Sequence, residues 1–274
     1  MPRSAGILNF PDFRGFTRAL ILWNVGAYFL LLLIGLLSAP LANDVIAFSA
    51  LIPPLFLHGY LWQIVTYCFI HQGTPGIQGI LRTALEMLSL WFLGSFLESN
   101  HGPRWLAELF FTSVIGAGLT AIGLGLVLQA DMLPIYGAFG GIFGLLVAFG
   151  VLYGNMEFML FPLPMTMKAK YLVIVYMLIA VAMVFSSSRV YALAQLGGAL
   201  AGYLYVKAAP RRGYAFATSE KYFGLRNNYY RWKRRRAAKK FEVYMRKQNR
   251  DVHFDKDGRY QGSEKDPNDR RWMN

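Results

Sequence analysis

Cysteine and charge are scarce in the first three quarters of this 274-residue chain. Its single cysteine, Cys68, excludes an intramolecular disulfide and says nothing about the redox compartment. Residues 40–80 contain no lysine or arginine, and the first 206 residues hold only eight basic and seven acidic side chains. About a quarter of the residues in a typical soluble domain are charged, so this scarcity argues against a soluble protein.

Apolar residues dominate instead, at 55% of the chain, with 16% aromatic residues. A helix that crosses a bilayer needs about 20 consecutive, mainly apolar residues. The sequence contains six windows of suitable length and therefore predicts an all-α polytopic membrane protein built as a six-helix bundle. The windows are 19–39, 81–98, 105–128, 138–155, 169–186 and 189–207.

Basic residues alternate between the connections of these windows. They occur before the first window, after the second at Arg104, after the fourth at Lys168 and Lys170, and throughout the chain after the sixth. The remaining connections contain one basic residue, Arg189. Because lysine and arginine near the ends of spans stay in the cytoplasm, we expect both termini to be cytoplasmic, in a bacterial inner membrane. Residues 1–18 then form a cytoplasmic N-terminal segment.

The first connection, residues 40–80, is too apolar to be a simple loop and too interrupted by proline and glycine to be a span. Irregular backbone lies at membrane depth only where it is buried in protein or faces a cavity. We therefore predict a structured, partly immersed loop on the outer side, with Tyr60, Trp62 and Tyr67 at the membrane interface. A short seventh span is the alternative.

Five segments, taken together and in this order, resemble the rhomboid family of intramembrane serine proteases. The resemblance covers about residues 60–206, with about six extra residues near Thr74–Ile80. It implies a catalytic serine on the fourth span and a histidine base on the sixth, with a histidine and an asparagine on the second span helping to hold the oxyanion. The segments are WQIVTYCFIH (62–71), EMLSLWFLGSFLESNHG (86–102), GAFGGIFGLL (137–146), PMTMKAKY (164–171) and AQLGGALAGYLY (194–205).

The residues at these four positions lack the required chemistry. Carried over from the family, the serine position is Phe139, the base is Gln195, and the oxyanion positions are Arg82 and Glu86. Acyl transfer needs a nucleophile with a removable proton and a base of suitable pKa, which phenylalanine and glutamine do not provide. The sequence thus predicts a pseudoprotease that binds transmembrane clients or a membrane complex, without a cofactor or a metal.

Two alternatives stay open at this stage. The first is an active intramembrane serine-type endopeptidase with non-standard catalytic residues, for which Ser186, Ser187 and Ser188 are the available hydroxyls near the sixth span. The second is a structural subunit of a larger membrane assembly, whose basic tail would dock a soluble partner.

Glycines recur on the fourth and sixth predicted spans. Gly137, Gly141 and Gly144 precede or follow Phe139 at close spacing, and Gly198 and Gly202 lie on the sixth span. Small residues at such spacing allow two helix backbones to approach closely in a membrane. We therefore predict that these glycines form the packing face between the two spans.

Arg82 and Glu86 are four residues apart and would share one face of a helix. Ionisable residues within a span are costly and point to function by default. They form either a buried pair in the former catalytic cavity or a pair that reaches the outer headgroups, with the arginine extending along the helix.

The charge of the protein is concentrated in its last segment. Residues 207–274 contain 20 basic and 8 acidic side chains, which gives +12 of the whole chain's +13. Residues 208–251 are predicted to form an amphipathic helix, with Ala237, Ala238, Phe241, Tyr244 and Met245 at helical spacing on one face and basic residues on the other. The residues expected to contact a membrane surface or a partner are Arg231, Lys233, Arg234, Arg235, Arg236, Lys239, Lys240 and Phe241.

Three interpretations of this basic tail remain: a solvated positive segment, an anionic lipid or protein contact, and, least favoured, nucleic acid. From residue 252 the sequence is polar and rich in turn residues, so disorder is predicted for 252–274. Asp255 and Asp257 precede a glycine but lack the other ligands of a calcium loop, so no metal site is predicted there.

Overall fold

A computed structural model describes most of the chain, in two compact units. We call the part up to Tyr214 the membrane unit and the part from Ala215 the tail unit. The six-span domain was expected at 19–207, so the boundary falls just beyond its predicted end. The described residues are 13–71, 77–127, 134–160, 165–186, 189–208, 214–248 and 252–261.

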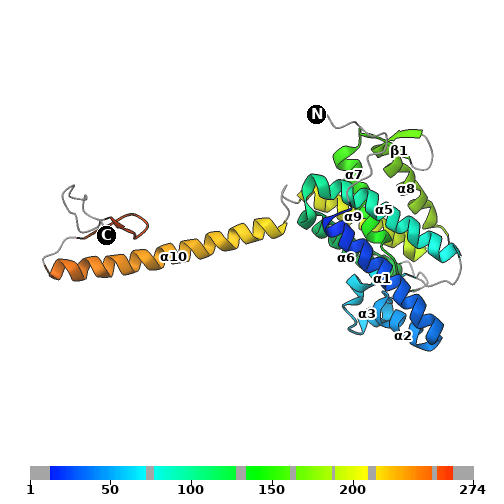
Figure 1. The fold of residues 1–274 in the computed structure, drawn as a ribbon, viewed down its shortest axis with the longest axis horizontal. Coiled ribbons are helices and arrows are strands. Elements are labelled where there is room, and N and C mark those ends of the chain that lie inside the picture. Colours follow the sequence, from blue (N-terminus) through cyan, green and yellow to red (C-terminus); the bar gives the residue numbers. More distant parts are fainter. Residues whose placement is uncertain are drawn as a thin grey trace. The chain divides into compact units, whose positions relative to one another are not determined.

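Each of the six predicted windows corresponds to a helix of the membrane unit (Figure 1). Three of these helices, α1, α5 and α6, are long and apolar enough to cross a bilayer. The prediction of an all-α membrane protein is thus confirmed. The helices are α1 (Gly15–Leu37), α5 (Ile77–His101), α6 (Pro103–Val127), α7 (Phe139–Tyr153), α8 (Ala169–Met183) and α9 (Arg189–Ala208).

The α5–α6 junction illustrates how local sequence sets these boundaries. Gly102 follows α5 with a φ of 89°, a left-handed conformation that glycine adopts without steric cost. Pro103 then begins α6, at the helix position where a missing N–H is tolerated. The glycine–proline pair therefore ends one helix and starts the next within two residues.

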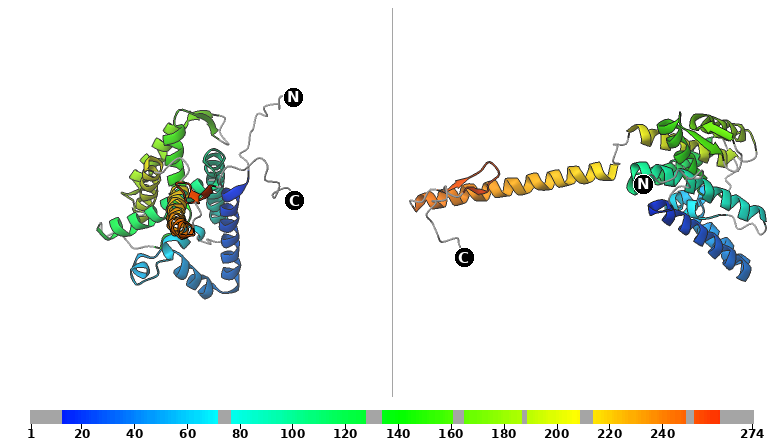
Figure 2. Two further views of the ribbon diagram at one scale, coloured as in Figure 1. Left: turned by 90° about the vertical axis from the view of Figure 1, so that its left-hand side faces the viewer. Right: turned by 45° about the horizontal axis from the view of Figure 1, so that its top comes forward.

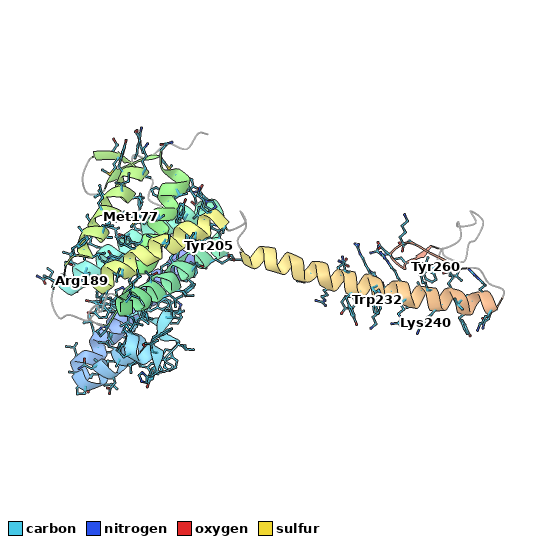
Figure 3. The ribbon with its side chains drawn as sticks, turned by 180° about the vertical axis from the view of Figure 1, so that it is seen from behind. Met177, Arg189, Tyr205, Trp232, Lys240 and Tyr260 are labelled. Carbon is cyan, nitrogen blue, oxygen red and sulfur yellow. The ribbon has the colours of Figure 1, made fainter. Side chains whose placement is uncertain are left out.

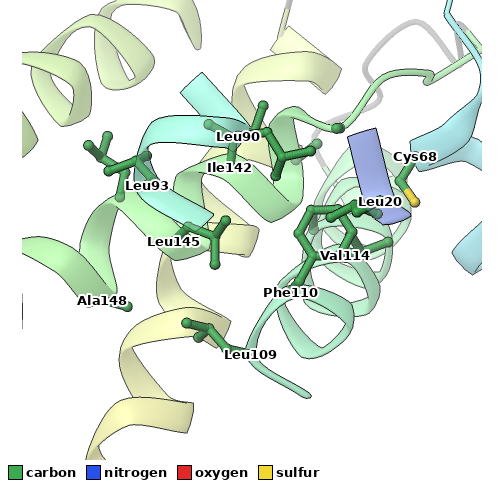
Figure 4. Close-up of a cluster of buried hydrophobic side chains, with 14 of the residues drawn as sticks. Leu20, Cys68, Leu90, Leu93, Leu109, Phe110, Val114, Ile142, Leu145 and Ala148 are labelled. Atoms are coloured by element: carbon green, nitrogen blue, oxygen red, sulfur yellow. The ribbon is translucent and has the colours of Figure 1, made fainter. Parts of the chain in front are cut away.

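Helices α6, α7 and α9 pack on one another and form the centre of the membrane unit. Their buried side chains meet α5 in one apolar cluster that includes Leu90, Phe110 and Leu145 (Figure 4). Phe149 belongs to the same cluster. Helices α1 and α5 lie side by side, as two views agree (Figures 1 and 2). Helix α8 borders α7 and α9 and, in its described part, buries only alanines, which leaves most of its apolar surface outward.

The carboxylate of Glu98, near the end of α5, holds the start of α1. It accepts hydrogen bonds from the backbone N–H groups of Phe16 and Thr17 at 2.7 and 2.8 Å, and from the Thr17 hydroxyl at 2.6 Å. Arg14, at the N-cap of α1, offers no side-chain cap. Because the first N–H groups of a helix lack internal partners, Glu98 caps α1 and fixes it against α5.

The glycine-rich faces of α7 and α9 form a close seam. A Cβ atom on Gly198 would overlap the carbonyl oxygen of Gly140, and one on Gly202 would lie 2.6 Å from Cα of Gly144. Gly141 instead faces the Phe110 ring on α6, because one residue turns the helix by about 100°.

Gly137 precedes α7 and does not take part in this seam. Of the five glycines predicted to pack the two spans together, the structure therefore places Gly144, Gly198 and Gly202 at their contact. Gly141 and Gly137 serve other contacts.

The described part of the first connection, up to residue 71, folds into four short helices rather than a seventh span. The longest has 11 residues, about 16 Å, which is well short of a bilayer. The Gln63 side chain links two of them, accepting from Ile52 N and donating to Ala47 O at 3.1 and 2.8 Å. The helices are α2 (Ala39–Ser49), α3 (Pro53–Leu57), α4 (Gln63–Thr66) and the 3₁₀ helix η1 (Tyr67–Phe69).

The three aromatic residues expected at the membrane interface divide in the structure. Tyr60 and Trp62 are partly exposed, and their rings contact each other at a tilt of 46°, with centroids 4.9 Å apart. Tyr67 is buried, and its hydroxyl donates to the Val114 carbonyl at 2.7 Å. The interface prediction is therefore wrong for Tyr67, because a polar partner on α6 allows its phenol to enter the core.

Two small antiparallel hairpins complete the described structure. Strands β1 (Glu157–Leu160) and β2 (Met165–Lys168) join α7 to α8. In the tail unit, β3 (His253–Phe254) pairs with β4 (Tyr260–Gln261) after the long helix α10 (Tyr214–Lys247). The predicted basic helix at 208–251 is thus present as α10, whereas disorder from residue 252 is wrong for 252–261.

The turn of the β3–β4 hairpin explains this correction. The Asp255 carboxylate accepts the backbone N–H groups of Asp257 and Arg259 at 2.8 and 2.7 Å, and Gly258 takes a φ of 75°. The Arg259 N–H bond in particular holds the pKa of Asp255 below its usual value. Composition alone did not reveal this local ordering. Residues 262–274 and 1–12 lie outside the described part.

Candidate functional site

The candidate site lies where the first residues of α7 meet the first half of α5 and of α9. Arg82 and Glu86 are on α5, Phe139 is the first residue of α7, and Gln195 is on α9. These four positions are the ones that the resemblance assigns to catalysis.

Glu86 is the centre of the site and is only 3% exposed. Its Oε2 atom lies 3.0 Å from Nε2 of His71 and accepts the backbone N–H of Ala138 at 3.3 Å. Its Oε1 atom lies 3.6 Å from Nε of Arg82. The buried carboxylate thus joins the first connection, α5 and the residue that caps α7.

Gly137 allows the backbone before α7 to approach this carboxylate. Its φ of 96° is a conformation that side chains disfavour, and a Cβ atom there would lie 3.1 Å from Oε2 of Glu86. The glycine predicted to pack helices is therefore a backbone element of the site.

Arg82 lies at the rim of the site, with a side chain that is half exposed. Its guanidinium carbon is 5.4 Å from the centroid of the Phe139 ring and 5.9 Å from that of the Tyr191 ring. Such distances are typical of cation–π contacts. The structure combines features of both interpretations of the Arg82–Glu86 pair, because the glutamate is buried while the arginine reaches outward between two rings.

Phe139 packs its ring onto an apolar cluster shared by α7, α8 and α9, which includes Phe143, Ala180 and Ala199. Gln195 is half-buried on α9, and the described residues offer its side chain no hydrogen bond. The serine position is thus occupied by a packed ring, and the base position by an amide without a protein partner in the described structure.

A small pocket lies beside Glu86, and His71 is one of the residues that line it. Its Nδ1 atom is buried without a partner among the described residues, and its ring meets that of Tyr28 edge-on at 6.4 Å. Its other ring nitrogen, Nε2, lies 3.0 Å from Oε2 of Glu86. The pocket is lined by His71, Gly79, Arg82, Thr83, Glu86, Tyr136 and Gly137.

Sequence reasoning missed the contribution of Tyr191 to this site. Tyr191 lies four residues before Gln195 on α9, so the two share a helix face. Its ring contacts Arg82, and its hydroxyl donates to the Pro134 carbonyl at 3.2 Å. The helical spacing from Gln195 was a usable signal, because a residue one turn closer to the helix start must lie nearer the mouth of the site.

The described structure does not bring an alternative serine nucleophile into contact with a histidine base. The Ser186 hydroxyl donates to the Met183 carbonyl at 2.8 Å, and residues 187–188 lie outside the described part. His58 contacts the Pro54 carbonyl and His101 contacts the Tyr153 hydroxyl. Across the described residues, no group of His, Cys, Asp and Glu side chains is arranged to hold a metal ion.

The basic residues predicted in the tail are divided between two sides of α10. Arg231 and Arg235 face Asp257 of the hairpin, and the Phe241 ring meets that of Phe254. Arg234 lies under the hairpin turn, where Gly258 contacts its backbone. The other predicted residues, Lys233, Arg236, Lys239 and Lys240, are exposed.

These observations define an all-α, multi-pass integral membrane protein whose helix starts converge on a buried polar cluster. A sequence comparison with family models matches the Rhomboid domain at residues 58–212, which is more than half of the chain. The chain belongs to the rhomboid family, as the five segments indicated. No curated protein matches the chain.

Proposed function

We propose that this rhomboid-family protein is a pseudoprotease, which binds transmembrane clients or a membrane complex without cleaving them. The observation that carries the proposal is the pair of residues at the nucleophile and base positions, Phe139 and Gln195. A benzyl side chain has no proton to lose, and a carboxamide does not accept one near neutral pH.

The contacts of Glu86 give the proposal a second, independent support. An acyl-transfer site stabilises a developing oxyanion with N–H donors aimed at it. Here the Ala138 N–H, just before α7, is taken by the buried Glu86 carboxylate at 3.3 Å. A second negative charge beside this carboxylate would be repelled, so a serine at position 139 alone would not restore the reaction.

The outward surface of the membrane unit supports client binding. Helix α8 exposes Ile174, Leu178 and Val181 along its length. Helices α7 and α8 have 15 residues each, about 22 Å, against a hydrocarbon thickness of about 30 Å. Short helices favour a locally thinner bilayer, where a client helix with polar residues is accommodated at lower cost.

The charge distribution supports an orientation with both termini in the cytoplasm. Arg104 precedes α6, and Lys168 and Lys170 lie at the start of α8, on the connections that the positive-inside rule assigns to the cytoplasm. Within this proposal the membrane is a bacterial inner membrane.

Activity-based labelling tests the absence of catalysis. The purified chain in lipid nanodiscs is treated with a fluorophosphonate probe, beside the variant Phe139→Ser/Gln195→His and the same variant carrying Arg82→His/Glu86→Asn. We expect no labelling of the wild type or of the double variant, and labelling of the quadruple variant. Labelling of the wild type that a competing serine-protease inhibitor abolishes would overturn the proposal.

Photo-crosslinking tests client binding. A crosslinking amino acid replaces Leu178 on α8 and, as a matched control, Leu36 on α1, which is also exposed and apolar. We expect many substoichiometric transmembrane proteins captured from position 178 and few from position 36. Equal capture from both positions contradicts a client site, and one stoichiometric partner favours a structural subunit instead.

A further inference from the structure

The apolar side of α10 is covered by protein, contrary to the picture of a simple amphipathic tail. Ala238 is buried, and the Phe241 ring meets the Phe254 ring of the hairpin at 6.2 Å and nearly at a right angle. Asp257 Oδ1 lies 3.4 Å from a terminal nitrogen of Arg235. A Cβ atom on Gly258 would lie 2.8 Å from the backbone of Arg234, so the hairpin turn rests directly on the helix.

The opposite side of α10 is exposed among the residues that the structure describes, and it is basic. Exposed residues recur there every three or four positions, which keeps them on one face of a helix. The stripe extends over about 32 Å. Figure 3 shows Lys240 and Trp232 on the helix and Tyr260 on the hairpin. We call this stripe the open face; its residues are Arg226, Tyr229, Lys233, Arg236, Lys240, Val243 and Lys247.

Charge is segregated between the two sides of the tail unit. Where the structure describes the side chains of the tail unit, the acidic ones, Glu242, Asp255 and Asp257, belong to the hairpin or to the side of α10 that faces it. The open face combines five cations with one tyrosine and one valine. Trp232 and Tyr244, at its edges, are each more than half exposed. A face of this kind is complementary to a surface that repeats phosphate groups.

We propose that the open face of α10 binds the anionic headgroups of a phospholipid surface. Only residues 209–213 separate α9 from α10, a stretch that reaches about 20 Å when extended, so the face is tethered near headgroups at high local concentration. Exposed tryptophan and tyrosine at its edges match the preference of these residues for the headgroup region. The inference concerns the tail unit and holds whether or not the membrane unit is catalytic.

Because the hairpin covers the apolar side of α10, the proposed contact with headgroups should depend on salt. An amphipathic helix that buries its apolar face among acyl chains binds even at high salt. Here the hairpin occupies that face, so attraction comes from charge and must weaken as salt screens it. Nucleic acid offers the same phosphates but no membrane tether, which makes it the competing outcome of the test.

The test uses the full chain in nanodiscs of phosphatidylcholine alone or with 30% phosphatidylglycerol. In a Cys68→Ser background, an environment-sensitive fluorophore is attached at Val243→Cys, on the open face, or at Glu242→Cys, on the hairpin side. We expect a blue shift and quenching by headgroup-attached nitroxides at position 243 only, with phosphatidylglycerol only, and loss of both at 0.5 M salt.

Charge-matched variants locate the contact. Lys233→Glu/Arg236→Glu/Lys240→Glu should abolish the response, whereas Lys239→Glu/Arg246→Glu/Lys256→Glu, with the same change of charge off the open face, should keep at least half of it. Equal loss in both variants shows that net charge rather than a face is responsible and overturns the proposal. So does a response of position 243 to added RNA in phosphatidylcholine nanodiscs with none to phosphatidylglycerol.

Discussion

Helices α7 and α9 meet in two regions that follow different rules. Along their seam, backbone touches backbone: Gly198 faces the Gly140 carbonyl, and Gly202 faces Cα of Gly144. Near their starts, the buried carboxylate of Glu86 on α5 is contacted by the His71 and Arg82 side chains and by the backbone N–H of Ala138. The seam requires residues without a side chain, whereas the site requires hydrogen-bond and charge partners for its buried polar groups.

This difference shows why the family's fold can exist with another set of residues at the catalytic positions. The seam accepts no side chain at Gly198, whatever the protein does, because the obstacle is a backbone oxygen. The site tolerates a glutamate because His71, Arg82 and the Ala138 N–H together satisfy it. Packing and chemistry are thus separable requirements, even within one pair of helices.

A large effect on stability is expected in the seam. Gly198→Ala forces α7 and α9 apart and should lower the free energy of unfolding by about 3 kcal/mol or more, at the upper end for overpacked sites. The measurement is the unfolding midpoint in mixed micelles.

Gly123→Ala on α6 is the matched control for this variant, because nothing lies within 4 Å of a Cβ atom there. Alanine has the higher helix propensity, so this change should be neutral or stabilising by up to about 1 kcal/mol. Equal destabilisation by the two variants would show that the seam has no special role.

A smaller effect is expected at the carboxylate. Glu86→Leu leaves the Ala138 N–H and His71 Nε2 buried without their partner, which should cost about 2 kcal/mol. Glu86→Gln keeps an acceptor oxygen and most of the volume, so its cost should stay below about 1 kcal/mol. The pair of variants is compared by thermal unfolding in detergent. If Gln and Leu destabilise equally, the hydrogen bonds of Glu86 contribute nothing.

Much of the membrane unit could be predicted from sequence, because hydropathy reports span length directly. The six windows each contain a helix, and the segments around Phe139 and Gln195 lead to the start of α7 and to α9. Whether Arg82 would be buried could not be predicted, since that depends on the rings of Phe139 and Tyr191 on other helices.

In the tail unit, less of the structure could be predicted from sequence. Periodicity in 208–251 was sufficient to predict a helix there, but not what covers its apolar side. The β3–β4 hairpin depends on one aspartate binding two backbone N–H groups and on a glycine with positive φ. Such contacts involve few residues and leave a polar composition that resembles disorder.

Two phenylalanine rings on α7 also differ: Phe139, at the serine position, and Phe149, which is fully buried. Phe139 is half-buried, whereas Phe149 is 2% exposed and meets Phe96 edge-on at 5.2 Å. Phe139→Ser should cost about 1 kcal/mol and Phe149→Ser about 4 kcal/mol, because the cost follows the apolar surface withdrawn from its surroundings. The unfolding midpoints of the two variants measure these costs. Similar costs would mean that the Phe139 ring contributes to stability as a core residue does.

The smallest expected effect is the contact between Arg82 and the Phe139 ring, which a double-mutant cycle isolates. Arg82→Lys keeps the charge near Glu86 but loses the planar group that lies 5.4 Å from the ring centroid, at a cost of about 0.5–1 kcal/mol. In a Phe139→Ser background the same change should cost almost nothing, since the ring is already absent. Strict additivity of the two variants would mean that the guanidinium and the ring are neighbours without an energetic link, and the site would then owe its arrangement to Glu86 alone.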